Sequence, residues 1–302
     1  MHIPDGFLAT RVWATLDVAA APAAVYAARR AQRGFQEWQA PLLGVMGAFV
    51  FAAQMINFPV AAGTSSHLVG GALLTYTLGP AAATVVMTAI LAMQALVFQD
   101  GGMLALGANI VNMAVLGVLA GWLPYRYWGS GRWRKAAIFL GGSLSVLASA
   151  TLALAELLLS GVRMPGAVLG ISMGVFAVSA VLEGAITLAV MSALEAMNPN
   201  FVRKPAQGPS YALGAVAAGA VLLAVVGVLF ASTHPDGIWS LAQKIGLASQ
   251  AKTLIHTPLE SYEAAFLQSA WQRKAVAGLT GLALIFGACV LFGRLVTRNR
   301  SA

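Results

Sequence analysis

Residues 67–79 read HLVGGALLTYTLG, and this short apolar stretch decides how the rest of the chain is threaded. The stretch has 13 residues, whereas a helix needs about 20 apolar residues to cross a bilayer. By length alone it is a buried or re-entrant segment. If it is a crossing, every later segment changes sides, so the charges along the rest of the chain must decide.

The composition is typical of a membrane protein. Of the 302 residues, 59% are hydrophobic and 9% are charged, which is too little polar surface to cover a water-soluble globule. Gly and Pro interrupt the apolar stretches without an amphipathic period, and this favours transmembrane helices over the strands of a barrel. We therefore expect an all-α integral membrane protein, multi-pass, with no soluble domain of useful size.

Nine apolar segments follow one another along the chain. The first is followed by three arginines and preceded by one, which is the reverse of a secretory signal peptide. The same asymmetry predicts that the amino terminus lies outside. The predicted spans are 12–28, 41–59, 67–79, 81–98, 107–125, 136–159, 166–194, 211–231 and 275–293.

Counting 67–79 as a crossing gives the better charge distribution. It places 12 of the 18 Lys and Arg residues, and the carboxyl terminus, on the cytoplasmic side, as the positive-inside rule favours. His2 and His67 then share the outer face. The net charge of +8 follows from these basic clusters at span ends, so we expect no nucleic-acid partner. The predicted outside segments are 61–67, 99–106 and 232–274.

A polar, Pro-rich linker divides the chain. It runs from Asn198 to Pro209, between the seventh and eighth spans. The predicted domains are a seven-helix membrane domain, residues 1–200, and a two-helix transmembrane hairpin with a long outside loop, residues 201–302.

The opening hexapeptide, MHIPDG, can form a metal site. The amine of Met1, the amide nitrogen of His2 and Nδ1 of the His2 ring can close fused chelate rings around one ion if the amide is ionised. A fourth nitrogen is needed, and His67 is the best candidate. A lone His in such a loop more often bonds a neighbouring helix, but a second His on the same face, attached to a chelating terminus, favours a metal.

The chemistry of four nitrogen donors narrows the choice of ion. Nickel(II) and copper(II) fit square-planar nitrogen sites, and cobalt(II) also accepts nitrogen ligands with less preference for planarity. Nickel is favoured and cobalt stays open. The nitrogens must lose protons before they bind, so uptake is expected to weaken at acidic pH. The single cysteine, Cys289, leaves no disulfide framework or thiolate site.

Several polar side chains lie at or within the apolar spans. Amides in such places usually bond neighbouring helices, and the alternative is a set of partners that orients His67. For Glu156 and Glu183 we expect a protonated or paired structural role. Asp5 is expected to bond backbone amides or to act on the ion electrostatically. The candidate supporting amides are Asn57, Gln94, Asn109 and Asn112, with Asn109 the first choice.

Three motifs carry a family resemblance. MHIPDGFL at 1–8, NFPVAAGTSSHLVGG at 57–71 and GANIVNMAVLG at 107–117 closely resemble the CbiM/NikM substrate-binding components of energy-coupling factor (ECF) transporters for cobalt and nickel. The resemblance covers about residues 1–200. In that family the terminal amine, the second residue's amide and imidazole, and the loop histidine hold the metal, which implies Met1, His2 and His67 here.

The carboxyl-terminal hairpin resembles the small PDGLE-type NikN subunit. Pro235-Asp236-Gly237 matches the motif, while Ile238-Trp239 replaces its Leu-Glu. The span-loop-span layout fits as well, and this second resemblance favours nickel over cobalt.

The resemblance implies transport and no enzymatic activity. The chain would bind nickel(II) outside a prokaryotic cell membrane and deliver it inward as one component of an ABC importer, with an ECF coupling (T) subunit and ATPase subunits as partners. No phosphate-binding GxxxxGK[ST] loop is present, so ATP hydrolysis must occur elsewhere. The alternatives are cobalt(II) uptake for cobalamin synthesis, a membrane metalloenzyme, and a metal sensor or assembly protein. Neither a catalytic residue nor a catalytic cofactor is expected.

Overall fold

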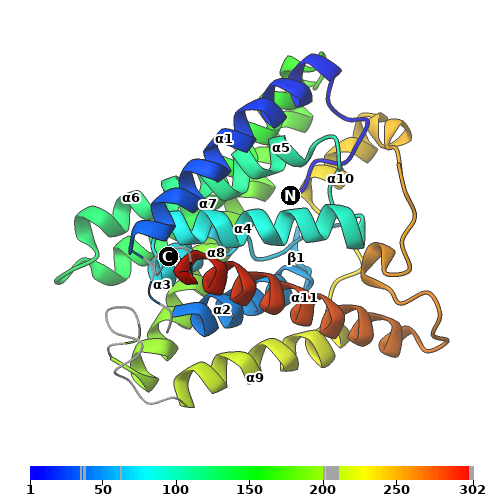
Figure 1. Ribbon diagram of the computed structural model, residues 1–302. Coiled ribbons are helices and arrows are strands. Elements are labelled where there is room, and N and C mark those ends of the chain that lie inside the picture. The colour runs from blue at the N-terminus through cyan, green and yellow to red at the C-terminus, as the bar shows by residue number, and fades with distance from the viewer. Residues whose placement is uncertain (35, 37–38, 62, 200, 202–210, 299–302) are drawn as a thin grey trace.

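The protein is mainly helical. The computed structural model describes residues 1–34, 36, 39–61, 63–199, 201 and 211–298, and Figure 1 shows how the helices pack. The predicted linker and domain boundary near residue 200 lie largely outside the described residues. The helical elements are α1 (Thr10–Gly34), α2 (Ala40–Gln54), α3 (Gly71–Leu78), α4 (Pro80–Met93), η2 (Gln94–Phe98), α5 (Leu106–Asn109), η3 (Ile110–Gly117), α6 (Val118–Trp128), α7 (Arg134–Leu159), α8 (Gly166–Met197), α9 (Tyr211–Val225), η5 (Gly227–Leu229), α10 (Gly237–Lys244), η6 (Leu247–Gln250), η7 (Glu260–Tyr262) and α11 (Ala270–Arg298).

Six helices of the described chain are long and apolar enough to cross a membrane. The predicted multi-pass membrane protein is thereby confirmed. The other three predicted spans fall on α1, α2 and α3, of which α2 has 15 residues and α3 has 8. The six helices are Pro80–Phe98, Leu106–Trp128, Arg134–Leu159, Gly166–Met197, Tyr211–Leu229 and Ala270–Leu295.

Short α3 still connects the two ends of the bundle. The start of α2 lines a cavity of about 330 Å³ together with Gly79, the residue after α3. The end of α2 lies beside His67, because Gln54 Nε2 donates to the carbonyl of Val69 at 2.7 Å. The two ends of a helix as long as α2 are about 20 Å apart. Residues 67–79 therefore run beside α2, from near its end to near its start, with non-helical residues ahead of α3.

The chain around α3 is shaped by two glycines. Gly70 precedes the helix with a φ of 76°, and Gly79 ends it with a φ of 82°. Both angles lie in the left-handed region that favours glycine, and Pro80 then begins α4 at a position where its missing N–H costs nothing. All residues of α3 from Gly71 to Thr77 are buried, so the helix lies inside the bundle.

A short β-hairpin replaces the last part of the predicted span 41–59. The predicted span 41–59 is too long, since α2 ends at Gln54. Pro59 disfavours helical conformation in the residue before it, and Gly63 has a φ of 71° in the turn. This β-hairpin leads directly to His67. Its antiparallel strands are β1 (Phe58–Ala61) and β2 (Thr64–Ser66).

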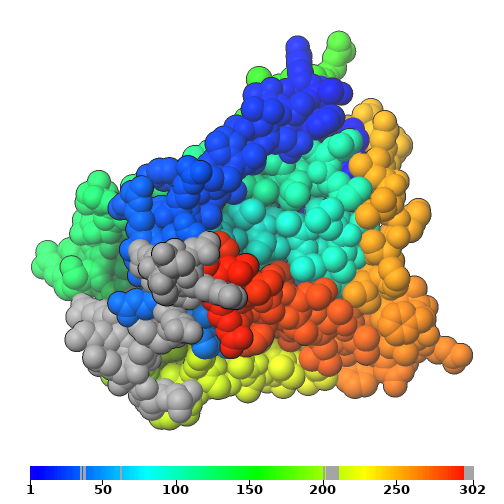
Figure 2. Space-filling model, in the orientation of Figure 1, coloured from blue at the N-terminus to red at the C-terminus, as the bar shows by residue number. Residues whose placement is uncertain are grey.

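The predicted outside loop 232–274 also differs from the expectation, because it contains helix α10. Asp236 caps this helix, its Oδ1 accepting the backbone N–H of Trp239 at 2.8 Å. In Figure 2 the segment between α9 and α11, coloured yellow to orange, covers one end of the bundle beside η2 and the amino-terminal segment.

Glu183 on α8 anchors the residues between His67 and α3. Its two carboxylate oxygens accept the backbone N–H groups of Val69 and Gly70, each at 2.8 Å. Glu183 is 1% exposed, so both bonds are shielded from water. Glu156 on α7 is paired as well, since it accepts a hydrogen bond from Asn112 at 2.9 Å. The expected paired role of both glutamates is confirmed.

The double bond from Glu183 leads to a stability prediction. Glu183→Gln keeps the volume but replaces one accepting oxygen with an N–H₂ group, which leaves a buried backbone N–H without a partner. We expect the free energy of unfolding, measured by denaturation in detergent micelles, to fall by about 1–3 kcal/mol. Glu195→Gln is the control, because Glu195 pairs with Arg134 in a partly exposed position and its loss should cost less than about 1 kcal/mol. Equal stability of the Glu183 variant and the wild-type chain would contradict the anchoring role.

Candidate metal centre

The first residues of the chain form a buried segment ahead of α1. Met1, His2 and Ile3 are 4%, 3% and 0% exposed. The side-chain amide of Asn109, at the end of α5, binds this segment through both of its polar atoms. Its Oδ1 accepts the Ile3 N–H at 2.9 Å, and its Nδ2 donates to the Ile3 carbonyl at 3.1 Å. The backbone immediately after His2 is therefore fixed in position.

Asp5 fixes the next part of the same segment. Its carboxylate accepts the backbone N–H groups of Met103, Leu104 and Ala105 at 2.9, 2.8 and 3.1 Å. These donors belong to the non-helical residues immediately ahead of α5, whose N–H groups need an acceptor because they are partly or fully buried. The expectation that Asp5 bonds backbone amides is confirmed.

His67 presents one ring nitrogen to the amino terminus. Its Nδ1 lies 2.9 Å from the carbonyl of Leu68, which can only accept, so Nδ1 carries the proton and Nε2 is the free acceptor. Nε2 lies 2.8 Å from the amine of Met1. Burial, together with the nearby amine and His2, lowers the pKa of His67 to about 3. The ring is therefore neutral at physiological pH, as a metal ligand must be.

His2 lies against His67. The two rings are stacked, with centroids 5.3 Å apart and planes inclined by 7°. Nδ1 of His2 is 3.2 Å from Oδ1 of Asp100, but the two atoms are not aligned for a hydrogen bond, and both ring nitrogens of His2 are buried without a hydrogen-bond partner. Buried polar atoms usually have a hydrogen-bond partner, so the ring nitrogens of His2 remain available to a ligand.

Asp100 was not among the predicted site residues. Burial opposes its ionisation, but the attraction and contact of His2 outweigh this, and the hydrogen bond from Tyr262 at 2.6 Å adds to them. The pKa of Asp100 is therefore held below its usual range. Asp100 follows the fourth predicted span and lies in a segment expected on the same side of the membrane as His2. This position was the signal in the sequence that could have identified it.

Asp236 is the second residue that sequence reasoning missed. Its Oδ2 lies 2.7 Å from the amine of Met1, in an ion pair that joins the amino terminus to the carboxyl-terminal hairpin. Burial raises the pKa of this carboxyl, but the adjacent amine lowers it by more, so the pKa is below its usual value. The Pro-Asp-Gly motif at 235–237 marked the segment, but not its contact with the terminus.

The predicted supporting amides have different partners. Asn109 holds the amino-terminal segment rather than His67. Gln94 donates to Gln54 at 2.8 Å, and Gln54 in turn binds the loop after His67. Asn57 lines a cavity of about 370 Å³ together with His67, Asp100 and Asp236. Asn112 donates to Glu156 inside the bundle.

One distance at the amino terminus matches the spacing of two nitrogens bound to one ion. Two nitrogens that bind one ion at right angles, at bond lengths of about 2.0 Å, lie about 2.8 Å apart. The amine of Met1 and Nε2 of His67 are separated by that distance. Within the described chain no three His, Cys, Asp or Glu side chains cluster as a metal site.

Family profiles match both parts of the chain. The profile of CbiM, described as the cobalt uptake substrate-specific transmembrane region, matches residues 2–201. The profile of the PDGLE domain matches residues 211–298.

Similar proteins of known sequence are named as nickel or cobalt transport proteins. The chain is 31% identical over 296 residues to the probable fused nickel transport protein LarMN of Lactiplantibacillus plantarum, covering 92% of this chain and 90% of that protein. It is 36% identical over 226 residues to the putative fused nickel transport protein NikMN of Archaeoglobus fulgidus, covering 72% and 73%. It is 34% identical over 214 residues to the cobalt transport protein CbiM of Acetoanaerobium sticklandii, covering 64% and 84%.

A solved structure has the same fold over most of the chain. The crystal structure of a transition metal transporter aligns with a TM-score of 0.58 and 30% sequence identity, covering 68% of this chain and 98% of that one. These relatives are metal transport proteins and not enzymes. The chain therefore belongs to the CbiM family of membrane metal-transport components and carries a PDGLE domain at its carboxyl end.

Proposed function

We propose that this protein is the substrate-binding membrane component of an ECF-type ABC importer that captures nickel(II) outside the cell and delivers it to the cytoplasm. The observation that carries the proposal is the 2.8 Å approach of the Met1 amine to Nε2 of His67, with His2 stacked beside them. The proposed ligands are the Met1 amine, the His2 amide nitrogen and Nδ1, and His67 Nε2.

Nickel is preferred over cobalt for two reasons. An ionised amide with three further nitrogens makes a strong planar field, which suits nickel(II) better than cobalt(II). The relatives that combine both parts in one chain are named as nickel transport proteins. Cobalt remains the second candidate, because the CbiM description and a relative name cobalt.

The proposed path of the ion follows from the position of the site. The amino terminus is proposed to lie outside, with the described carboxyl end on the cytoplasmic side, a seven-helix domain over residues 1–200 and a hairpin domain over 201–302. The cavity that borders His67, Asp100 and Asp236 gives a hydrated ion access to the chelate. The site excludes water once the nitrogens close around the ion, since Met1, His2 and His67 are each at most 5% exposed. Release is assigned to ATP hydrolysis by partner subunits.

Transport itself can be tested with radioactive ions. Cells or vesicles that contain this chain with its coupling and ATPase subunits should accumulate nickel in an ATP-dependent manner, and cobalt more weakly. A Walker-motif variant of the partner ATPase is the control. Absence of ATP-dependent uptake of both ions would refute the transporter proposal, and stronger uptake of cobalt would reverse the choice of ion.

The free amine gives a second prediction. Three extra glycines before Met1 should abolish high-affinity nickel binding, because the amine moves away from His67 and His2 no longer closes a short chelate ring with it, although every side chain remains. The same three glycines added after Ala302 are the control and should leave binding unchanged. Titration calorimetry in detergent measures both. An unchanged affinity of the amino-terminally extended chain would contradict the chelate.

The loop histidine gives a third prediction. His67→Ala should lower nickel affinity by at least about 100-fold, since removal of one of four nitrogens destroys the planar ligand set. His256→Ala is the matched control, because His256 is 79% exposed and pairs with Glu260 outside the site. Visible absorption of the nickel complex should be lost for the first variant and retained for the second. Equal affinities of the two variants would exclude His67 as a ligand.

A further inference from the structure

Asp236 joins the carboxyl-terminal hairpin to the first residue of the chain. Its Oδ2 accepts from the Met1 amine at 2.7 Å, while its Oδ1 accepts the N–H of Trp239 at 2.8 Å. The second bond is the cap of α10, so the orientation of the carboxylate is set by the helix start. The side chain of Asp236 is 14% exposed, and the ion pair is therefore largely shielded from water.

The backbone around Asp236 is bonded to the strand that leads to His67. The N–H of Ser65 donates to the carbonyl of Pro235 at 2.9 Å, and its hydroxyl donates to the carbonyl of His234 at 2.7 Å. Gly237 packs so closely on α8 that a Cβ there would lie 2.5 Å from the ring of Phe176. The anchor of the amine and the loop of His67 are therefore parts of one hydrogen-bonded unit.

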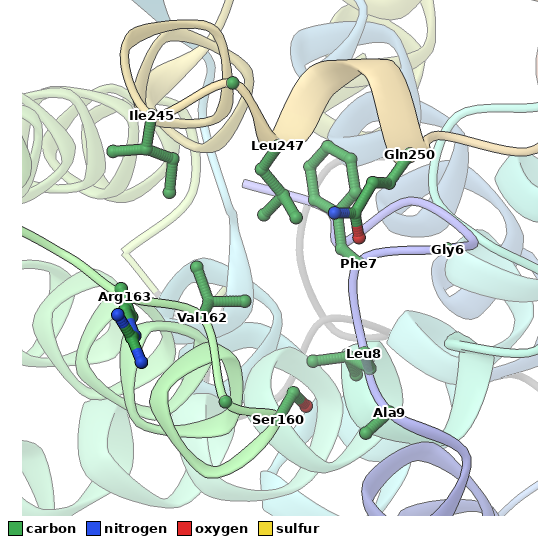
Figure 3. A pocket seen from close by; sticks show the side chains of 12 residues that line it. Gly6, Phe7, Leu8, Ala9, Ser160, Val162, Arg163, Ile245, Leu247 and Gln250 are labelled. Atoms are coloured by element: carbon green, nitrogen blue, oxygen red, sulfur yellow. The ribbon is translucent and has the colours of Figure 1, made fainter.

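The hairpin also contacts the residues that follow the proposed chelate. The N–H of Lys252 donates to the carbonyl of Asp5 at 2.9 Å, and the rings of Phe7 and Trp239 meet edge to face with centroids 5.6 Å apart. Figure 3 shows the next stretch, where Gly6 to Ala9 line a cavity of about 440 Å³ opposite the segment after α10. The amino-terminal segment is thus held between the hairpin and the rest of the bundle.

Charge balance points to the same carboxylate. One ionised amide offsets only one of the two charges of nickel(II), and the amine and both imidazoles are neutral as ligands. A buried net charge is costly without a counter-charge. Asp236 lies 2.7 Å from the Met1 nitrogen and Asp100 lies 3.2 Å from Nδ1 of His2, so the two carboxylates flank the proposed chelate.

We propose that Asp236 makes the hairpin part of the metal centre, as a positioning residue outside the ligand set that holds the terminal amine beside His67 and offsets the one positive charge that the ionised amide leaves on the bound dication. This inference rests on the proposed nickel chelate. It assigns the hairpin a direct role in ion binding, carried by the aspartate of the Pro-Asp-Gly motif.

The test compares carboxylate variants of the hairpin in the full chain. Asp236→Asn keeps an oxygen that can cap α10 but removes the charge and the ion pair. Its dissociation constant for nickel should rise by about 10- to 100-fold, as for other partners of metal ligands. At saturating nickel its visible absorption should match that of the wild-type chain, because the nitrogen ligands are intact. Glu260→Gln, in the same loop but paired with His256, is the control and should bind as the wild type does.

Two results would overturn the inference. One is wild-type affinity for nickel in Asp236→Asn. The other is altered absorption at saturating nickel, which would mean that Asp236 determines which atoms bind the ion. If Asp236→Asn does not fold, Asp236→Ser gives the same reading, since serine also caps helices and is too short to reach the amine. Failure here is distinct from failure of the chelate, because normal nickel binding by the chain extended before Met1 would refute the chelate whatever Asp236 does.

Discussion

The buried amino terminus is the constraint on which the rest of this structure depends. A charged amine at the 4% exposed Met1 requires polar partners, because an unpaired ion in a protein interior costs several kcal/mol. Its partners are Nε2 of His67 and the carboxylate of Asp236, which are 66 and 235 residues away in the sequence. The loop before α3 and the loop before α10 must therefore meet at one end of the bundle, with the amino-terminal segment between them.

Carboxylates stabilise the irregular segments that build this end. Glu183 binds two backbone N–H groups after His67, and Asp5 binds three immediately ahead of α5. These segments lack the internal hydrogen bonds of a helix, so buried acceptors must supply them. The nitrogens of Met1, His2 and His67 are consequently held by main-chain geometry, and little conformational freedom would be lost when an ion binds.

The hairpin is integrated into the body of the protein. Cβ atoms added at Gly44 or Gly47 of α2 would meet side chains of α11 at 2.7 to 3.2 Å, so these two helices touch along small residues. Cys289 lies in this contact, which agrees with a packing role. Through the same hairpin, Asp236 and Tyr262 reach the candidate site. Because both parts belong to one chain, the bundle and the hairpin are present in equal numbers and stay close together.

The sequence by itself determined the membrane class and most helices, because composition and apolar length are local properties. The chelating chemistry of an amino-terminal Xaa-His is local as well, and from it the sequence predicts Met1, His2 and His67 as ligands. It also indicated that 67–79 extends through the bundle, since charge counts follow chain order. It missed the β-hairpin, α10 and the partners of the amides, which depend on neighbours far away in sequence. Only the tertiary structure decided that Asp100 and Asp236 flank the amino terminus. A carboxylate acts as a counter-charge through its proximity and burial, and neither can be read from the order of the residues.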